Sequence, residues 1–248
     1  MVLIKFGLEI EAEYNNTLYP LQVTGYHNSN VGDNFDSWSV TSDSSLTNTQ
    51  QWGEDSRVAE LVSTPLFGWE EVYSALLEVK AKANGKELNE CLLFNTSTGA
   101  HIHFSTWRGR EGDMMFMQHY NQLRNNVMAR VKEEYPRIYP LFKKQYIRDY
   151  SRTQHEMIIN KHDRRMEINY ESVAQGKGVE WRSFNLVGVE TWDELFGMYK
   201  IAVDELTKIM AEYEASNYRE FIELIASPED IAVATRELSQ LLEPLVEE

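Results

Sequence analysis

The chain has 248 residues, of which 42% are hydrophobic, 25% charged and 12% aromatic, a composition that excludes the disordered and fibrous classes. Its length predicts one elaborated domain or a domain with an appendage, because a single core rarely serves more than about 250–300 residues. With 24 Lys and Arg against 39 Asp and Glu, the formal net charge of −15 repels phosphates, so we expect no nucleic-acid partner.

The first predicted element is a strand that ends near Tyr14. The even-numbered positions from 2 to 14 are apolar, whereas Lys5, Glu9, Glu11 and Glu13 occupy odd-numbered positions. This period of two predicts a strand with one buried face. Three further elements are then predicted in order: a short strand at 38–41, a turn at 43–45 and a strand at 58–63.

The middle of the chain predicts a mixture of helices and strands. Apolar residues at three- and four-residue spacing predict a helix over 69–83, which Asn84 and Gly85 end. The elements predicted after it are an apolar run at 91–94, a turn of small residues at 96–99, a strand at 101–105, a helix from 116 to 131 that ends near Pro136, and a partly helical stretch at 137–152.

Two strands and a helical C-terminal part complete the predicted fold. The strands, at 166–170 and 179–184, are joined through a Gly-Lys-Gly sequence at 176–178 that is typical of a tight reversal. From Thr191 the apolar period is helical, and Thr191 with Glu194 forms a capping-box pattern. Another helix is predicted to open at 227–230. We expect an α+β fold with a curved, largely antiparallel sheet of about five or six strands and helices on its outer face. Residues 1–190 would form the main domain, and the helical part at 191–248 would pack on it.

The sequence also predicts where the protein resides. No stretch approaches the roughly 20 apolar residues that a membrane helix needs, and charged residues interrupt the first twelve positions. We therefore expect neither a membrane span nor a signal peptide. The single cysteine, Cys91, lies in an apolar run and cannot form an internal disulfide. A reducing compartment, the cytoplasm, fits this cysteine content.

Common nucleotide- and metal-binding motifs are absent from the sequence. The glycine and lysine pairs at 85–86 and 176–178 lack the spacing of a Walker loop, and no dinucleotide glycine fingerprint follows a predicted strand. His155 and Glu156 lack the second histidine of a metalloprotease helix. The apolar setting of Cys91 disfavours a cysteine nucleophile.

The polar faces of the predicted strands carry residues that bind metals and phosphates. Side chains two apart on a strand lie about 6–7 Å apart, so Glu9, Glu11 and Glu13 either form a solvated face or surround hard cations. The other same-face pairs are His101 with His103, Glu180 with Arg182, and Glu167 with Asn169. Glu180 and Arg182 could simply form an ion pair within one strand. Together, however, the four strands predict one sheet that lines a cleft, where clustered carboxylates repel one another unless cations neutralise them. This favours a site with two or three Mg²⁺ ions that binds nucleotide phosphates.

Five motifs, in order, give the sequence a family resemblance. They are FGLEIE at 6–11, WSVTSDSSL at 38–46, AELVSTPL at 59–66, NTSTGAHIHFS at 95–105, and RRMEINY at 164–170 followed by VEWRSF at 179–184. Through them the chain resembles the amidoligase family of the carboxylate-amine ligase superfamily, which is related to glutamine synthetase and γ-glutamylcysteine ligase. The resemblance covers roughly residues 4–190.

The resemblance implies a glutamine-synthetase-like catalytic fold that holds ATP and Mg²⁺ between acids on its sheet. The metal ligands that it implies are Glu9, Glu11, Glu60, His101 and Glu180, with His101 binding either metal or phosphate. Glu180 would bridge metal and nucleotide, and Arg182 would contact phosphate in the transition state, so that the implied catalytic residues are Arg182, Glu180 and Glu60. The residues at nucleotide-binding motif positions are Arg165, Asn169, His103 and Arg182.

The expected function is therefore ATP- and Mg²⁺-dependent formation of an amide between a carboxylate and an amine, through an acyl phosphate. The substrates would be small molecules or peptides. Two features depart from the family pattern: its Asp-Gly-Ser turn is Asp43-Ser44-Ser45 here, and the loop at 25–35 is not covered.

Two alternatives stay open from the sequence. The first is an ATP-independent metallohydrolase or cupin-like enzyme in which His101, His103 and a glutamate bind Zn²⁺, Fe²⁺ or Mn²⁺. The second is a binding protein without turnover. The sequence has no heptad repeat, so it does not predict the oligomeric state.

Overall fold

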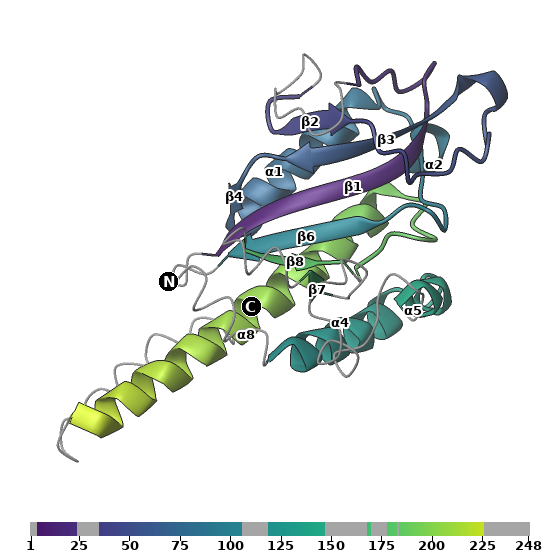
Figure 1. The fold of residues 1–248 in the computed structure, drawn as a ribbon. Coiled ribbons are helices and arrows are strands. Elements are labelled where there is room, and N and C mark those ends of the chain that lie inside the picture. The colour runs from purple at the N-terminus through teal and green to yellow at the C-terminus, as the bar shows by residue number, and fades with distance from the viewer. Residues whose placement is uncertain are drawn as a thin grey trace.

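A computed structural model describes residues 4–23, 35–105, 119–146, 168–169, 178–182 and 184–225. These residues form an α+β structure around one antiparallel sheet (Figure 1). Its strands are β1 (Lys5–Asn15), β2 (Trp38–Thr41), β3 (Ser56–Ser63), β4 (Leu66–Phe67), β5 (Leu92–Leu93), β6 (Ala100–Ser105), β7 (Ile168–Asn169) and β8 (Val179–Trp181). The main path through the sheet is β2-β3-β1-β6-β8-β7, and β4 and β5 also pair with β1.

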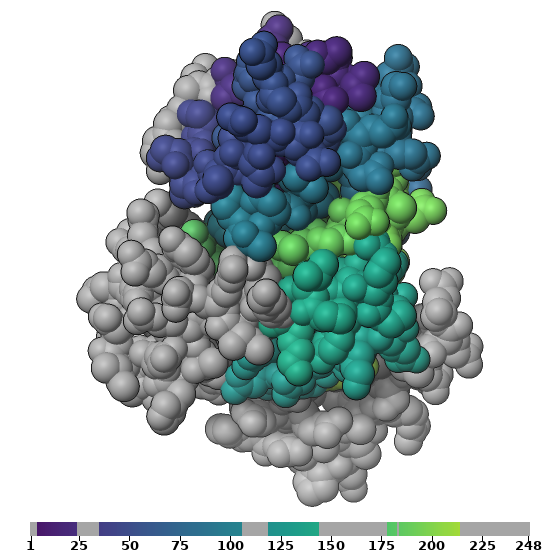
Figure 2. All heavy atoms as spheres, turned by 90° about the vertical axis from the view of Figure 1, so that its right-hand side faces the viewer, coloured from purple at the N-terminus to yellow at the C-terminus, as the bar shows by residue number. Residues whose placement is uncertain are grey.

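The helices lie mainly on one side of the sheet. They are the short 3-10 helix Gly53–Asp55, α1 (Gly68–Lys82), α2 (Leu88–Cys91), α4 (Tyr120–Glu134), α5 (Tyr139–Tyr146) and α8 (Trp192–Ile225). Helices α1 and α8 contact each other and cover the back of the sheet, and α4 packs on α8 (Figure 1). From the side, residues of the β2–β3 region and the α4–α5 pair lie on opposite sides of the segment that leads into α8 (Figure 2).

Strand β1 is central because the hydropathy alternation of its sequence matches the two faces of the sheet. Phe6, Leu8 and Ile10 are fully buried against the helices. We call the opposite face, away from α1 and α8, the front face. Of the two alternatives for its acids, a solvated face does not hold for Glu11 and Glu13, which are only 7% and 0% exposed.

A bulge interrupts the pairing of β1 beside the front face. Glu9 lies opposite Val62 and Phe6 lies opposite Leu66, so three residues, 63–65, face two on β1. The Ser63 hydroxyl accepts the Leu8 backbone N–H at 2.9 Å, which satisfies a donor that the ladder leaves free. A bulge also tolerates Pro65, which has no N–H to donate.

Most predicted elements are confirmed where the structure describes them, including helix α1, which ends at Lys82 shortly before Asn84 and Gly85, both with positive φ. The Thr191–Glu194 capping box also forms, with the Glu194 N–H 3.2 Å from the Thr191 hydroxyl. The expected strand number is too low, since the two-residue strands β4 and β5 give an eight-stranded sheet. The apolar run at 91–94 is split between the end of α2 and β5. Strand β8 ends at Trp181, so the predicted strand to 184 is too long.

Other predictions fall partly outside the described residues. The start of the helix predicted at 116, most of the reversal at 176–178 and the helix expected after 227 lie there. The antiparallel pairing of the last two strands is confirmed, because Ile168 pairs with Trp181. The boundary at residue 190 and the glutamine-synthetase-like identity of the fold stay predictions.

In the described part of the chain, the helices are either too short or too polar to serve as a membrane-spanning segment.

Gly197 of α8 provides a test of the helix packing. A Cβ at this position would lie 1.6 Å from the hydroxyl oxygen and 2.6 Å from Cζ of Tyr135. Although alanine favours a helix over glycine by about 1 kcal/mol, we expect Gly197→Ala to lower the free energy of unfolding by about 2 kcal/mol. Urea denaturation measures this change. In a Tyr135→Ala background the same substitution should instead stabilise the protein, and a loss in both backgrounds would contradict the packing explanation.

Candidate functional site

The register of the sheet brings polar side chains of three neighbouring strands together on the front face. Across β1, β6 and β8, Gly7 lies opposite His103, which lies opposite Glu180. Two residues further along β1, and therefore on the same face, Glu9 lies opposite His101. Directly opposed residues in antiparallel strands share a face, so these side chains meet.

Glu9 is the centre of this group. Its two carboxylate oxygens accept hydrogen bonds from His101 Nδ1 at 2.7 Å and from His103 Nε2 at 2.8 Å. Burial opposes ionisation of Glu9, but the two imidazoles outweigh it and hold its pKa well below the usual range. Burial likewise opposes protonation of His101, yet the hydrogen bond with Glu9 and the charge of Glu11 raise its pKa to about 9. At neutral pH, Glu9 and His101 therefore form an ion pair.

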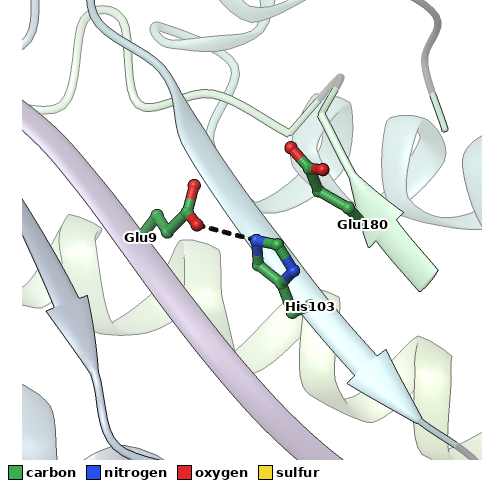
Figure 3. Close-up of side chains that lie close together, drawn as sticks. All are labelled: Glu9, His103 and Glu180. Carbon is green, nitrogen blue, oxygen red and sulfur yellow. Dashed lines mark hydrogen bonds and ion pairs between the residues drawn. The ribbon is translucent and has the colours of Figure 1, made fainter. Parts of the chain in front are cut away.

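Glu9, His103 and Glu180 have the geometry of a metal site. Each offers one ligand atom, and these atoms all lie within 4.8 Å of one another. The three side chains project from the same side of β1, β6 and β8 (Figure 3). Ligand atoms at about 2.0–2.6 Å from a shared ion lie at most about 5 Å apart, so a single divalent cation fits after small side-chain adjustments.

Glu180 links this cluster to the predicted phosphate-binding arginine. Its Oε1 lies 3.2 Å from Arg182 Nε and 3.9 Å from His101 Nδ1. The Arg182 side chain is 27% exposed, whereas that of Glu180 is only 10% exposed. The ion pair that the sequence left open as an alternative therefore forms, and it places a guanidinium at the accessible edge of the candidate metal site.

Glu11 and Glu60 form a second acidic pair beside the first group. They lie directly opposite each other on β1 and β3, and the Thr41 hydroxyl donates to Glu60 Oε2 at 2.9 Å. Burial, together with the charges of Glu9 and Glu11, raises the pKa of Glu60 to about 7. Burial also raises the pKa of Glu11, despite the nearby His101 and the Gly99 N–H. At both glutamates, burial therefore outweighs the charge of His101 and the hydrogen-bond donors that favour the ionised carboxylate.

Gly99 fills a position where a side chain would disturb both groups. Its N–H donates to Glu11 Oε2. A Cβ at residue 99 would lie 2.9 Å from that carboxylate oxygen and 3.0 Å from His101 Nε2. Gly99, the last residue of the predicted turn at 96–99, therefore borders both groups, a role that its sequence alone does not reveal.

Glu13, the third acid of the β1 pattern, has a structural role. Its carboxylate accepts hydrogen bonds from the Thr49 N–H at 2.8 Å, the Thr49 hydroxyl at 2.6 Å and the Gln51 N–H at 2.9 Å. Although burial opposes ionisation, these donors lower the pKa of Glu13. Asn95 and Ser97 join the same loop to the segment before β6. Glu13 therefore anchors the loop at 49–51 to β1.

The structure thus places the predicted site residues in two neighbouring groups. Among the described residues, the ligand atoms close enough for one ion belong to Glu9, His103 and Glu180, whereas Glu11, Glu60 and His101 adjoin them. Asn169 pairs with Glu180 in the sheet register, and Arg165 lies outside the described residues. The sequence did not predict three residues that contact these glutamates. The Thr41 hydroxyl donates to Glu60, the Gly99 N–H donates to Glu11, and the Tyr199 hydroxyl donates to the Glu9 backbone carbonyl. Thr41 and Gly99 do occur within the motifs of the resemblance.

Comparisons with known proteins add no relative to this description. No protein-family model matches the chain, and searches of curated proteins and of solved structures found no significant match.

Proposed function

We propose that the protein is an ATP- and Mg²⁺-dependent ligase that joins a carboxylate to an amine in the cytoplasm, on a glutamine-synthetase-like fold. The observation that carries this proposal is the convergence of Glu9, His103 and Glu180 within 4.8 Å of one another, from three adjacent strands. Arg182, 3.2 Å from Glu180, adds a phosphate-binding group to the same cluster.

The donor set on the front face fits hard divalent cations. Carboxylate oxygens are the protein ligands that Mg²⁺ prefers, and four glutamates lie on this face within reach of one another's charges. Burial is the main cause of the raised pKa values of Glu11 and Glu60, and the charge of His101 offsets it only in part. A bound cation would favour the ionised carboxylates, and Mg²⁺ would also neutralise the phosphates of ATP.

The proposed reaction needs positioning and charge more than covalent help from the protein. A carboxylate is a poor acyl donor, because the leaving group in a direct attack by an amine would be an oxide ion. Transfer of the γ-phosphoryl group of ATP to a carboxylate oxygen releases ADP, and attack by the amine nitrogen on the acyl carbon then releases orthophosphate. In this scheme Arg182 binds the transferred phosphoryl oxygens, Glu180 orients Arg182, and the two histidines fix the orientation of the Glu9 carboxylate.

The nucleotide products test the reaction class. Incubation with Mg-ATP and pools of carboxylates and amines should yield ADP and orthophosphate together with a condensation product. Hydroxylamine should intercept the activated acyl group as a hydroxamate, which identifies the donor carboxylate. Formation of AMP and pyrophosphate in an amine-dependent reaction would rule out the acyl-phosphate route, and the Glu9→Gln variant serves as the inactive control.

A second candidate is an ATP-independent metalloenzyme, and the presence of His103 in the cluster favours it. Imidazole nitrogen suits Zn²⁺, Fe²⁺ and Mn²⁺ better than Mg²⁺, and His101 lies beside the same Glu9 carboxylate. Metal analysis of the purified protein separates the two candidates. Stoichiometric zinc or iron that survives dialysis would favour the metalloenzyme, because Mg²⁺ sites bind weakly. If the protein binds Mg-ATP but forms no product with any of the carboxylates and amines, the third possibility applies, a binding protein without turnover.

A further inference from the structure

A cluster of buried aromatic rings lies on the back of the sheet, directly behind the candidate metal site. Trp181 stands between Glu180 and Arg182 on the chain and is fully buried on the opposite face. Its ring centroid lies 5.5 Å from that of Phe184, which in turn lies 5.3 Å from that of Tyr199 on α8. Tilted contacts at these distances are favourable and resist sliding of the rings.

Tyr199 connects this cluster to the strand that carries Glu9. Its hydroxyl donates to the Glu9 backbone carbonyl at 3.4 Å, although the two residues are 190 positions apart in the sequence. The Tyr199 side chain is fully buried, and burial raises its pKa well above the ordinary value. The phenol is therefore neutral at all physiological pH values and keeps its proton for this hydrogen bond.

The two ends of the cluster thus reach the two carboxylates of the candidate metal site. Glu9 and Glu180 are not on neighbouring strands, because β6 lies between β1 and β8. The distance between their carboxylates depends on the pairing of these three strands and on the residues that pack against β1 and β8 on the back of the sheet. The cluster contacts β8 through Trp181 and β1 through the Tyr199 hydroxyl.

We propose that Tyr199 is a positioning residue. Its ring packs against Phe184, which packs against Trp181, and its hydroxyl holds β1, so that the Glu9 carboxylate is fixed relative to Glu180 for metal binding. The choice of metal binding as a readout rests on the proposed function. Residues that hydrogen-bond metal ligands orient them, and loss of such a partner typically weakens metal binding 10- to 100-fold.

The test compares Tyr199→Phe with Tyr19→Phe, a matched control. The Tyr19 hydroxyl is also buried and also donates to a backbone carbonyl, that of Val79 at 2.8 Å, but away from the front face. Both variants lose one buried hydroxyl and one hydrogen bond. The first measurement is Mn²⁺ binding by titration calorimetry. The second is the imidazole carbon–proton NMR signals of His101 and His103 in the metal-free protein, assigned by replacing the six histidines one at a time.

We expect Tyr199→Phe to weaken Mn²⁺ binding about tenfold and to shift both imidazole signals, because the Glu9 carboxylate that holds them moves. Tyr19→Phe should lower thermal stability and leave both readouts unchanged. Unchanged readouts in Tyr199→Phe, or equal changes in the two variants, would overturn the proposal. If the wild-type protein binds no Mn²⁺, the proposed function fails, and the imidazole signals alone decide the positioning role. Should Tyr199→Phe not fold, Phe184→Leu, which keeps the hydroxyl but removes the ring behind it, is judged by the same readouts.

Discussion

Glu9→Gln is expected to weaken Mn²⁺ or Mg²⁺ binding on the order of 100-fold while the fold survives. Glutamine keeps the size of the side chain but removes the charge that attracts the cation. Its amide can accept a hydrogen bond from only one of the two imidazoles, because its NH₂ group faces the other. Metal affinity measured by calorimetry, together with circular dichroism of both proteins, checks the result.

Glu78→Gln is the matched control for this substitution. Glu78 is similarly half-buried and accepts hydrogen bonds from the backbone N–H groups of Asp36 and Ser37, but it lies on α1 behind the sheet. Its variant should bind metal like the wild type. A Glu9→Gln protein that binds metal with unchanged affinity would remove Glu9 from the site and return it to the role of a structural partner of the two histidines.

Glu13→Gln, only four residues further along the same strand, is expected to give a loss of stability instead. The substitution removes the charge that three donors of residues 49–51 share and sets an NH₂ group against them. Hydrogen bonds to a buried charge are worth more than neutral ones, so the free energy of unfolding at pH 7 should fall by about 3 kcal/mol. The melting temperature should fall by roughly 6–12 °C.

The pH dependence of this loss identifies its cause. Because the folded protein lowers the pKa of Glu13, its contribution to stability is present above the pKa of the unfolded state and disappears as the pH falls through the folded value. The stability difference between wild type and Glu13→Gln should therefore shrink in acid. The control, Glu54→Gln, alters an exposed acid in the adjoining 3-10 helix and should be neutral. A difference that stays constant down to pH 3 would point to lost packing rather than lost charge.

The three glutamates of β1 show how far the sequence predicts this site. Their alternation correctly predicts a strand and a shared face, because that geometry is local. Their roles differ, however, since each role depends on what the rest of the chain brings to that point. Glu9 meets two histidines, Glu11 meets the Gly99 N–H, and Glu13 meets the loop at 49–51.

The register of the strands explains most of what the sequence could not predict. The pairing of His103 with Glu180 joins residues 77 positions apart, and no periodicity in the sequence specifies it. The donation from Tyr199 to Glu9 is equally non-local and comes from a helix that the sequence predicts only as an apolar stripe. Motif order, by contrast, places Glu60, His101 and Arg182 near the same site before their contacts are known.

The hydrogen bond between Tyr199 and the Glu9 carbonyl also bears on how the chain is made in a cell. Ribosomes add roughly 5–20 residues per second, so about 10–40 s pass between synthesis of Glu9 and synthesis of the tyrosine that holds it. During that time the apolar face of β1, with Phe6, Leu8 and Ile10, has no α8 to cover it. An uncovered strand of this kind is a substrate for chaperones and a template for aggregation. Slow translation between β1 and α8 should therefore reduce the yield of folded protein.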